Sequence, residues 1–249
     1  MIPYNSFHPF KKVLLLLLTA FLFGNCSKPQ SFDILIKNGQ LLDGTGAAII
    51  RGDLGINADT IAAMGNLSGA TGVKEIDAGD MVVAPGFIDL HTHLDPILEL
   101  SECESHLRQG VTTALGGPDG TSPWPFASYL DTLEQIGVGL NVGYLIGHNT
   151  VRRNVMQLDN RAPTHEELTA MKAQIGQAMQ EGAFGISTGL KYLPGAFSEV
   201  GEVIELSKVA AAGGGIYTSH LREEGLGLLQ AVREAIRISG EADIPVVLT

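Results

Sequence analysis

The most informative run in this 249-residue sequence is Pro85-Gly86-Phe87-Ile88-Asp89-Leu90-His91-Thr92-His93-Leu94-Asp95. From Ile88 onward, apolar and polar residues mostly alternate, which is typical of a strand. Side chains of a strand alternate between its faces, so Asp89, His91, His93 and Asp95 are expected on one face. Two imidazoles about 7 Å apart at the C-terminal end of a strand can chelate a divalent ion, and such sites suit zinc. His91 and His93 are therefore predicted metal ligands.

Downstream of this run, strand-like and helix-like segments alternate. The predicted strands are residues 82–93, 111–117, 142–148, 184–189, 216–220 and 246–249, and the predicted helices are 99–108, 126–136, 166–179, 199–212 and 227–238. Thr164 and Glu167 form a capping box at the start of the third helix. Regular alternation of this kind indicates an α/β fold with parallel strands and helical crossovers.

Upstream of the run, residues 32–80 contain short strand-like segments separated by turns such as Asn38-Gly39. This pattern predicts the N-terminal part of a small β domain. A piece of about 50 residues is marginal on its own, because small cores bury a low fraction of their surface.

The first 26 residues read as a secretory signal. Lys11 and Lys12 precede an apolar core over residues 13–23, which is too short to span a bilayer. The following Gly24-Asn25-Cys26 resembles a bacterial lipoprotein lipobox, with Asn25 as the departure. We expect Cys26 to be lipidated, residues 27–31 to form a tether, and the protein to be anchored by lipid alone in the bacterial cell envelope, facing the periplasm. The alternative is an ordinary signal peptide cleaved nearby.

Composition excludes several classes of protein. The chain has 16 Lys and Arg against 27 Asp and Glu, a net charge of −11, which argues against general nucleic-acid binding. Its 31 glycines show no Gly-X-Y period, which excludes collagen. Apart from Cys26 the chain holds one cysteine, Cys103, so no intramolecular disulfide is expected.

The Pro-Gly-Phe-Ile-Asp-x-His-x-His run resembles the amidohydrolase superfamily, metal hydrolases built on a TIM-type barrel. Four later runs are similar to its N-acyl-D-amino-acid deacylase (D-aminoacylase) branch; they are residues 110–113, 147–152, 182–195 and 217–225. The resemblance covers residues 32–249. It implies a (β/α)8 barrel preceded by a small β-sandwich segment, with one or two zinc ions.

The same resemblance implies further metal ligands. His220, at the end of the fifth predicted strand, stands where the superfamily places a ligand. D-aminoacylases commonly have a bridging Cys after strand two, and Asp119 occupies that position here; a carboxylate oxygen is a chemically reasonable replacement. Lys191, just after the fourth strand, is the competing candidate, because other members use a carboxylated Lys there.

Three residues are predicted to contact substrate. Tyr192 resembles a substrate-contacting Tyr of D-aminoacylases, and His148 ends the third predicted strand at the presumed mouth of the barrel. Arg222 has a bidentate guanidinium suited to a carboxylate. An ion pair with Glu223 or Glu224 is the alternative for Arg222.

The resemblance implies hydrolysis of the N-acyl amide bond of N-acyl-D-amino acids, releasing a carboxylate and a D-amino acid. The family's strand-eight Asp and strand-six His have no counterpart in this chain, so no catalytic residue is assigned. We expect residues 81–249 to be an incomplete barrel that stops within strand six, inactive and aggregation-prone on its own. Two alternatives are a cyclic-amide hydrolase of the dihydroorotase or hydantoinase type and a non-catalytic, lipid-anchored binding protein.

Overall fold

The computed structural model describes residues 30–249, which form two compact units, residues 30–85 and 86–249. The predicted signal, Cys26 and most of the predicted tether lie outside the described residues; Ser31 already belongs to the first strand. Across residues 30–249, no helix combines the length and apolar character needed to cross a membrane.

The first unit is a single sheet. Its strands are β1 (Ser31–Leu41), β2 (Ile50–Asn57), β3 (Thr60–Gly65), β4 (Thr71–Asp77) and β5 (Val82–Val83). β1 and β2 pair antiparallel, as do β2 and β3, whereas β4 and β5 both pair parallel with β1. Phe32, Leu35 and Ala70 form its small core. Residues 30–85 thus contain strands and no helix, and the small β domain with the second sheet of a sandwich stays a prediction.

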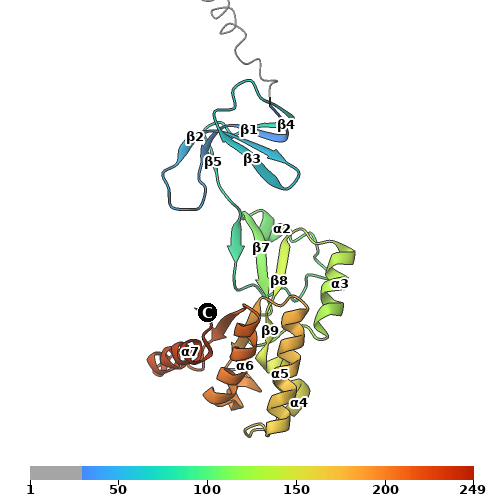
Figure 1. Cartoon of the computed structure of the whole chain (residues 1–249), viewed down its shortest axis with the longest axis vertical. Helices are drawn as coiled ribbons and strands as arrows, with labels where there is room; N and C mark the ends of the chain where they lie inside the picture. The colour runs from blue at the N-terminus through green and yellow to red at the C-terminus, as the bar shows by residue number, and fades with distance from the viewer. Residues whose placement is uncertain (1–29) are drawn as a thin grey trace, which may run out of the picture. The chain divides into compact units, whose positions relative to one another are not determined.

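The second unit is built from parallel strands in chain order (Figure 1). The strands are β6 (Phe87–Asp89), β7 (Val111–Gly116), β8 (Asn141–Tyr144), β9 (Ile146–Gly147), β10 (Gly185–Gly189), β11 (Ile216–His220) and β12 (Val246–Leu248). One sheet has the order β6-β7-β8 and the other β9-β10-β11-β12. Leu145 lies between β8 of the first sheet and β9 of the second, and its N–H donates to the Gly116 carbonyl of β7 at 3.0 Å. β8 and β9 therefore act as one interrupted third strand.

Helices follow the strands as the sequence pattern predicts. They are α2 (Glu104–Leu107), α3 (Phe126–Ile136), α4 (His148–Met156), α5 (His165–Gln180), α6 (Val200–Ala212) and α7 (Leu228–Ala242), with a short 3-10 helix, η1 (Gly195–Phe197). α5 packs between α4 and α6 (Figure 1) and buries Met171, Ile175 and Ala178 in the main core. The capping box of Thr164 and Glu167 is confirmed.

Four local predictions are wrong. Asn38-Gly39, which was expected to be a turn, lies inside β1, where the pairing with β2 only shifts in register. The continuous strand over residues 82–93 is two short strands, because Pro85-Gly86 interrupts it and the chain bends after Asp89. The helix over residues 99–108 is reduced to α2, preceded by turns around Pro96, whose carbonyl accepts from the Leu100 N–H. The helix α4 was not expected: His148 begins it instead of ending a strand.

Candidate metal centre and cavity

His91 and His93 lie in the bend after β6. The Asp89 carboxylate accepts a hydrogen bond from the His91 N–H at 3.0 Å, which turns the chain out of the strand. The two imidazoles lie edge to face, with ring centroids 5.4 Å apart. The bend, rather than strand alternation, brings the two rings together.

Asp119 lies on the loop after β7 in a left-handed conformation, with φ of 56°, between Gly117 and Gly120, whose φ is also positive. Ser187 of β10 ties this loop down: its hydroxyl donates to the Gly117 carbonyl at 2.6 Å and accepts from the Gly120 N–H at 3.1 Å. A Cβ at Gly189 would lie 2.1 Å from the Asp119 carbonyl oxygen. The glycine therefore lets the loop lie directly against β10.

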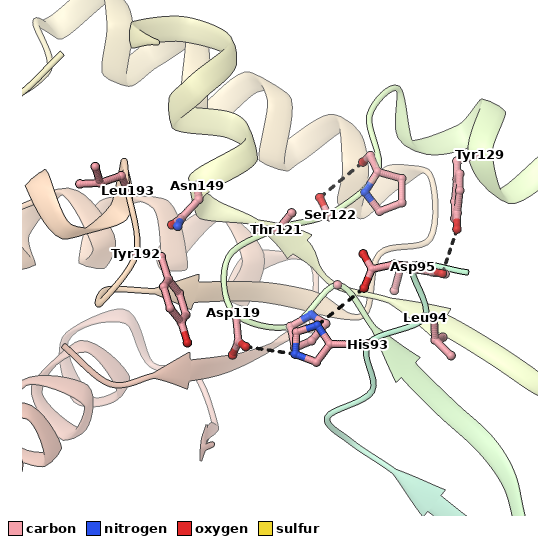
Figure 2. Close-up of a pocket in the computed structure, with 14 residues that line it drawn as sticks. His93, Leu94, Asp95, Asp119, Thr121, Ser122, Tyr129, Asn149, Tyr192 and Leu193 are labelled. Carbon is pink, nitrogen blue, oxygen red and sulfur yellow. Dashed lines mark hydrogen bonds and ion pairs between the residues drawn. The ribbon is translucent and has the colours of Figure 1, made fainter. Parts of the chain in front are cut away.

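The Asp119 carboxylate is the centre of a histidine cluster, and Figure 2 shows its contact with His93. Oδ2 lies 3.2 Å from His93 Nε2, and Oδ1 lies 3.7 Å from His91 Nε2. One ligand atom from each of these three residues lies within 4.8 Å of the other two. The cluster joins the bend after β6 to the loop after β7.

His220 reaches the same carboxylate from the end of β11. Its Nδ1 lies 3.5 Å from Asp119 Oδ1 and 3.5 Å from the Tyr192 hydroxyl. Its Nε2 lies 3.4 Å from a carboxylate oxygen of Glu224. The structure thus gathers four predicted ligands, His91, His93, Asp119 and His220, and adds Glu224, which sequence reasoning did not single out.

The donor set fits a divalent transition-metal ion. Three imidazoles and one carboxylate are nitrogen and oxygen ligands of the kind zinc accepts. Asp119 Oδ1 and His91 Nδ1 are buried without a hydrogen-bond partner, although buried polar atoms are normally paired. Asp119 Oδ1 faces the Nε2 of His91 and the Nδ1 of His220, so its unpaired lone pairs are available to a cation there.

A cavity of about 690 Å³ opens beside this cluster. The lining includes His93, Asp119, Asn149 and Tyr192, together with a pair of tyrosines, of which Tyr129 is labelled at the right of Figure 2. The hydroxyls of that pair, Tyr129 and Tyr144, lie 3.1 Å apart. Other lining residues are Leu94, Asp95, Gly117, Pro118, Thr121, Ser122, Pro123 and Leu193.

The tyrosine pair carries no sequence signal, because Tyr129 lies on α3 and Tyr144 on β8, and they meet only in the fold. Burial raises the pKa of the Tyr144 phenol, and its hydrogen bond with Tyr129 raises it further. Tyr144 therefore stays a neutral hydroxyl that can donate or accept a hydrogen bond. Asn149, in contrast, follows His148 within residues 147–152, one of the four runs that carry the family resemblance.

Lys191 and Arg222 have other partners in the structure. The Lys191 ammonium lies 3.7 Å from the Glu223 carboxylate. The Arg222 guanidinium holds Glu234 through two of its nitrogens, at 2.8–3.2 Å, and donates to the carbonyls of Ala196 and Ser198. The ligand role of Lys191 and the substrate role of Arg222 stay predictions.

His148 is fully buried at the start of α4. Its Nε2 lies 2.8 Å from Glu202 Oε1, and Glu202 also accepts from Arg152. Burial alone raises the pKa of Glu202, but His148 and Arg152 outweigh it, so this pKa lies below its ordinary value of 4.5. His148 is absent from the residues that line the cavity, and its predicted substrate contact stays a prediction.

Comparison with known proteins gives consistent matches. The model of a family described as the amidohydrolase family matches residues 74–248. A D-aminoacylase of Alcaligenes xylosoxydans xylosoxydans is 39% identical over 90% of this chain and 51% of its own length. The chain spans about half the length of the curated relatives it matches.

Two solved structures extend this likeness to the fold. An N-acyl-D-glutamate deacylase from Bordetella bronchiseptica, in complex with zinc and a phosphonate inhibitor, has a TM-score of 0.83 at 34% identity. A D-aminoacylase studied for its binuclear metal centre has a TM-score of 0.82 at 36% identity. Each covers 87% of this chain, which covers 51% of each of them.

Proposed function

The chain belongs to the amidohydrolase family, and we propose that its protein hydrolyses the N-acyl amide bond of N-acyl-D-amino acids. The observation that carries this proposal is the convergence of His91, His93, Asp119 and His220 beside a cavity of about 690 Å³. The relatives that act on N-acyl-D-amino acids support the choice of substrate.

The four clustered side chains would hold the ion, which we propose to be zinc, in one or two copies. When bound, zinc supplies Lewis-acid polarisation of the scissile carbonyl. Asp119 presents its two oxygens to different imidazoles, so it joins the histidines that follow β6 to the histidine of β11. Lys191 is the weaker ligand candidate, since its ammonium already faces Glu223.

Tyr192 is the residue we assign to substrate contact. It lines the cavity, and its ring packs against His220 at a tilt of 48°, with the centroids 4.7 Å apart. Its half-exposed phenol therefore stands beside the cluster with a free edge toward solvent. A phenol in this position can donate a hydrogen bond to a substrate carboxylate.

The test is a comparison of substrates and metal content on the complete gene product. We expect stoichiometric zinc and hydrolysis of N-acetyl-D-amino acids, with little turnover of the L-enantiomers or of hydantoins. Faster turnover of hydantoins would favour the cyclic-amide alternative. Protein without stoichiometric zinc would favour the binding-protein alternative.

We also propose that Cys26 is lipidated and anchors the protein in the bacterial cell envelope, facing the periplasm. The supporting observation is the sequence of residues 11–26 alone. Membrane fractionation tests it: Cys26→Ser should release the protein from the membrane pellet. Continued sedimentation of this variant with membranes would contradict a lipid anchor at Cys26.

A further inference from the structure

The loop that carries Asp119 is anchored by the first turn of α4. The Thr150 N–H donates to the Gly120 carbonyl at 3.1 Å. The Thr150 hydroxyl donates to the Ser122 carbonyl at 3.1 Å and accepts from the Ser122 N–H at 2.9 Å. The place of Asp119 therefore depends on where this turn lies.

Asn149 connects the same turn to β10. Its side-chain nitrogen donates to the Gly189 carbonyl at 3.3 Å, and Gly189 is the residue whose backbone lies against the Asp119 carbonyl. Its Oδ1 lies so near Gly120 that a Cβ there would be 2.6 Å away. Asn149 is 2% exposed, so water cannot replace these contacts freely.

His148 links Asn149 to α6. Its Nδ1 lies 3.3 Å from Asn149 Oδ1 on one side, and its Nε2 lies 2.8 Å from Glu202 on the other. The chemistry proposed above uses neither His148 nor Glu202. Burying an ionic group costs free energy of desolvation. The buried His148–Glu202 pair lies beside the loop that carries Asp119, and we therefore expect it to have a function.

We propose that the His148–Glu202 pair, acting through Asn149, is the positioning device that sets the Asp119 carboxylate for metal binding. The contacts run from Glu202 of α6 through His148 to Asn149, which lies against the Gly120 backbone and reaches the Asp119 carbonyl by way of Gly189. This inference rests on the proposed metal site. Outer partners that orient metal ligands commonly change metal affinity without touching the ion.

The experiment measures the affinity of the complete gene product for Zn²⁺ by chelator competition and records the Co²⁺ absorption spectrum. We expect His148→Gln and Glu202→Gln each to weaken Zn²⁺ affinity about 10- to 100-fold and to change the Co²⁺ ligand-field bands. The free energy of unfolding is measured for every variant, because loss of a buried pair also destabilises the fold.

Two control variants separate positioning from general stability. Glu205→Gln makes the same substitution on the same helix, where Glu205 pairs with Lys172 and Lys208 at the surface. Met171→Ala removes a fully buried side chain of α5. We expect both controls to keep wild-type Zn²⁺ affinity, even where Met171→Ala loses as much stability as Glu202→Gln.

Asn149→Ala completes a double-mutant cycle with His148→Gln, and it provides a milder variant if the others do not fold. If His148 acts through Asn149, the two losses of affinity are strongly non-additive. Additive losses, or unchanged Zn²⁺ affinity and Co²⁺ spectra in the folded variants, would overturn the proposal. Absence of metal binding by the wild-type protein would instead overturn the proposed function.

Discussion

Two clusters in the second unit each surround a carboxylate with histidine or arginine side chains, but their surroundings are opposite. Around Asp119, carboxylate oxygens and imidazole nitrogens lie 3.2–3.7 Å apart, and His93 is 59% exposed at the cavity. Around Glu202, His148 and Arg152 are fully buried and the histidine contact is 2.8 Å. The first cluster leaves room and unused lone pairs at its centre, whereas the second closes on itself. The first arrangement therefore suits an ion, whereas the second satisfies its own charges.

The largest expected effect breaks the first cluster at its centre. Asp119→Asn should weaken Zn²⁺ binding well beyond the roughly 10- to 100-fold cost of losing an outer partner, because a ligand oxygen becomes an amide nitrogen. Asn tolerates the left-handed backbone at this position, so the loop itself should persist. Chelator competition measures the change. Wild-type affinity in this variant would remove Asp119 from the ligand set.

The next effect falls on the stability of the second cluster. Glu202→Gln leaves His148 and Arg152 without their carboxylate, and breaking a buried pair costs about 3–5 kcal/mol. Urea denaturation at neutral pH measures this loss. A change below about 1 kcal/mol, the range of surface pairs, would mean that the pair is not buried in solution.

A pH series sharpens the same contrast. The pKa of Glu202 is lower in the folded state than its ordinary 4.5, so its contribution to stability is present above about pH 4.5 and is lost as the pH falls further. The difference in unfolding free energy between wild type and Glu202→Gln should therefore shrink as the pH falls below about 4.5, because this carboxyl protonates more readily in the unfolded chain than in the folded protein. A difference that stays constant over this range would contradict the lowered pKa.

A smaller effect concerns Arg222, which is half-buried and holds Glu234. Arg222→Lys keeps the positive charge but loses the paired hydrogen bonds from two guanidinium nitrogens to the Glu234 carboxylate. We expect the free energy of unfolding to fall by about 1–2 kcal/mol and the Zn²⁺ affinity to stay unchanged. Glu234→Gln should show a similar loss. If Arg222→Lys instead raised KM for an N-acyl-D-amino acid and left stability unchanged, the predicted substrate contact would be supported.

The smallest effect is a calibration far from both clusters. Thr164→Ala removes the N-cap of α5 and should cost about 1 kcal/mol in unfolding free energy. Zn²⁺ affinity should not change, since neither cluster includes this residue. A lower Zn²⁺ affinity in Thr164→Ala would mean that metal binding follows global stability. The affinity losses of the other variants would then not report on the two clusters.

Prediction from sequence succeeded where the signal is local. The helix over residues 126–136 and the strand over residues 216–220 are confirmed at both ends, and the capping box of Thr164 and Glu167 is present. These elements follow from apolar spacing and short-range hydrogen bonds. It failed at residues 82–93, where one strand was predicted across Pro85-Gly86 although the structure has two short strands there.

Candidate site residues divide in the same way. His91, His93, Asp119 and His220 were selected from a spacing pattern and a family resemblance, and the structure gathers them. The pairing of Tyr129 with Tyr144 and the link from Glu202 to His148 had no local signal. The link between Glu202 and His148 joins residues 54 positions apart in the sequence. It forms only because the fold brings α6 to the start of α4.

By itself, the sequence determined the parallel βα order, the histidine run after β6 and the acidic balance of 16 cationic against 27 anionic residues. Each of these depends on residue type or on spacing along the chain. Tertiary structure alone decided that Asp119 stands between three imidazoles and that His148 and Arg222 have carboxylate partners. Burial and distance govern those outcomes, because a buried charge takes whichever partner the packing of distant segments places within reach.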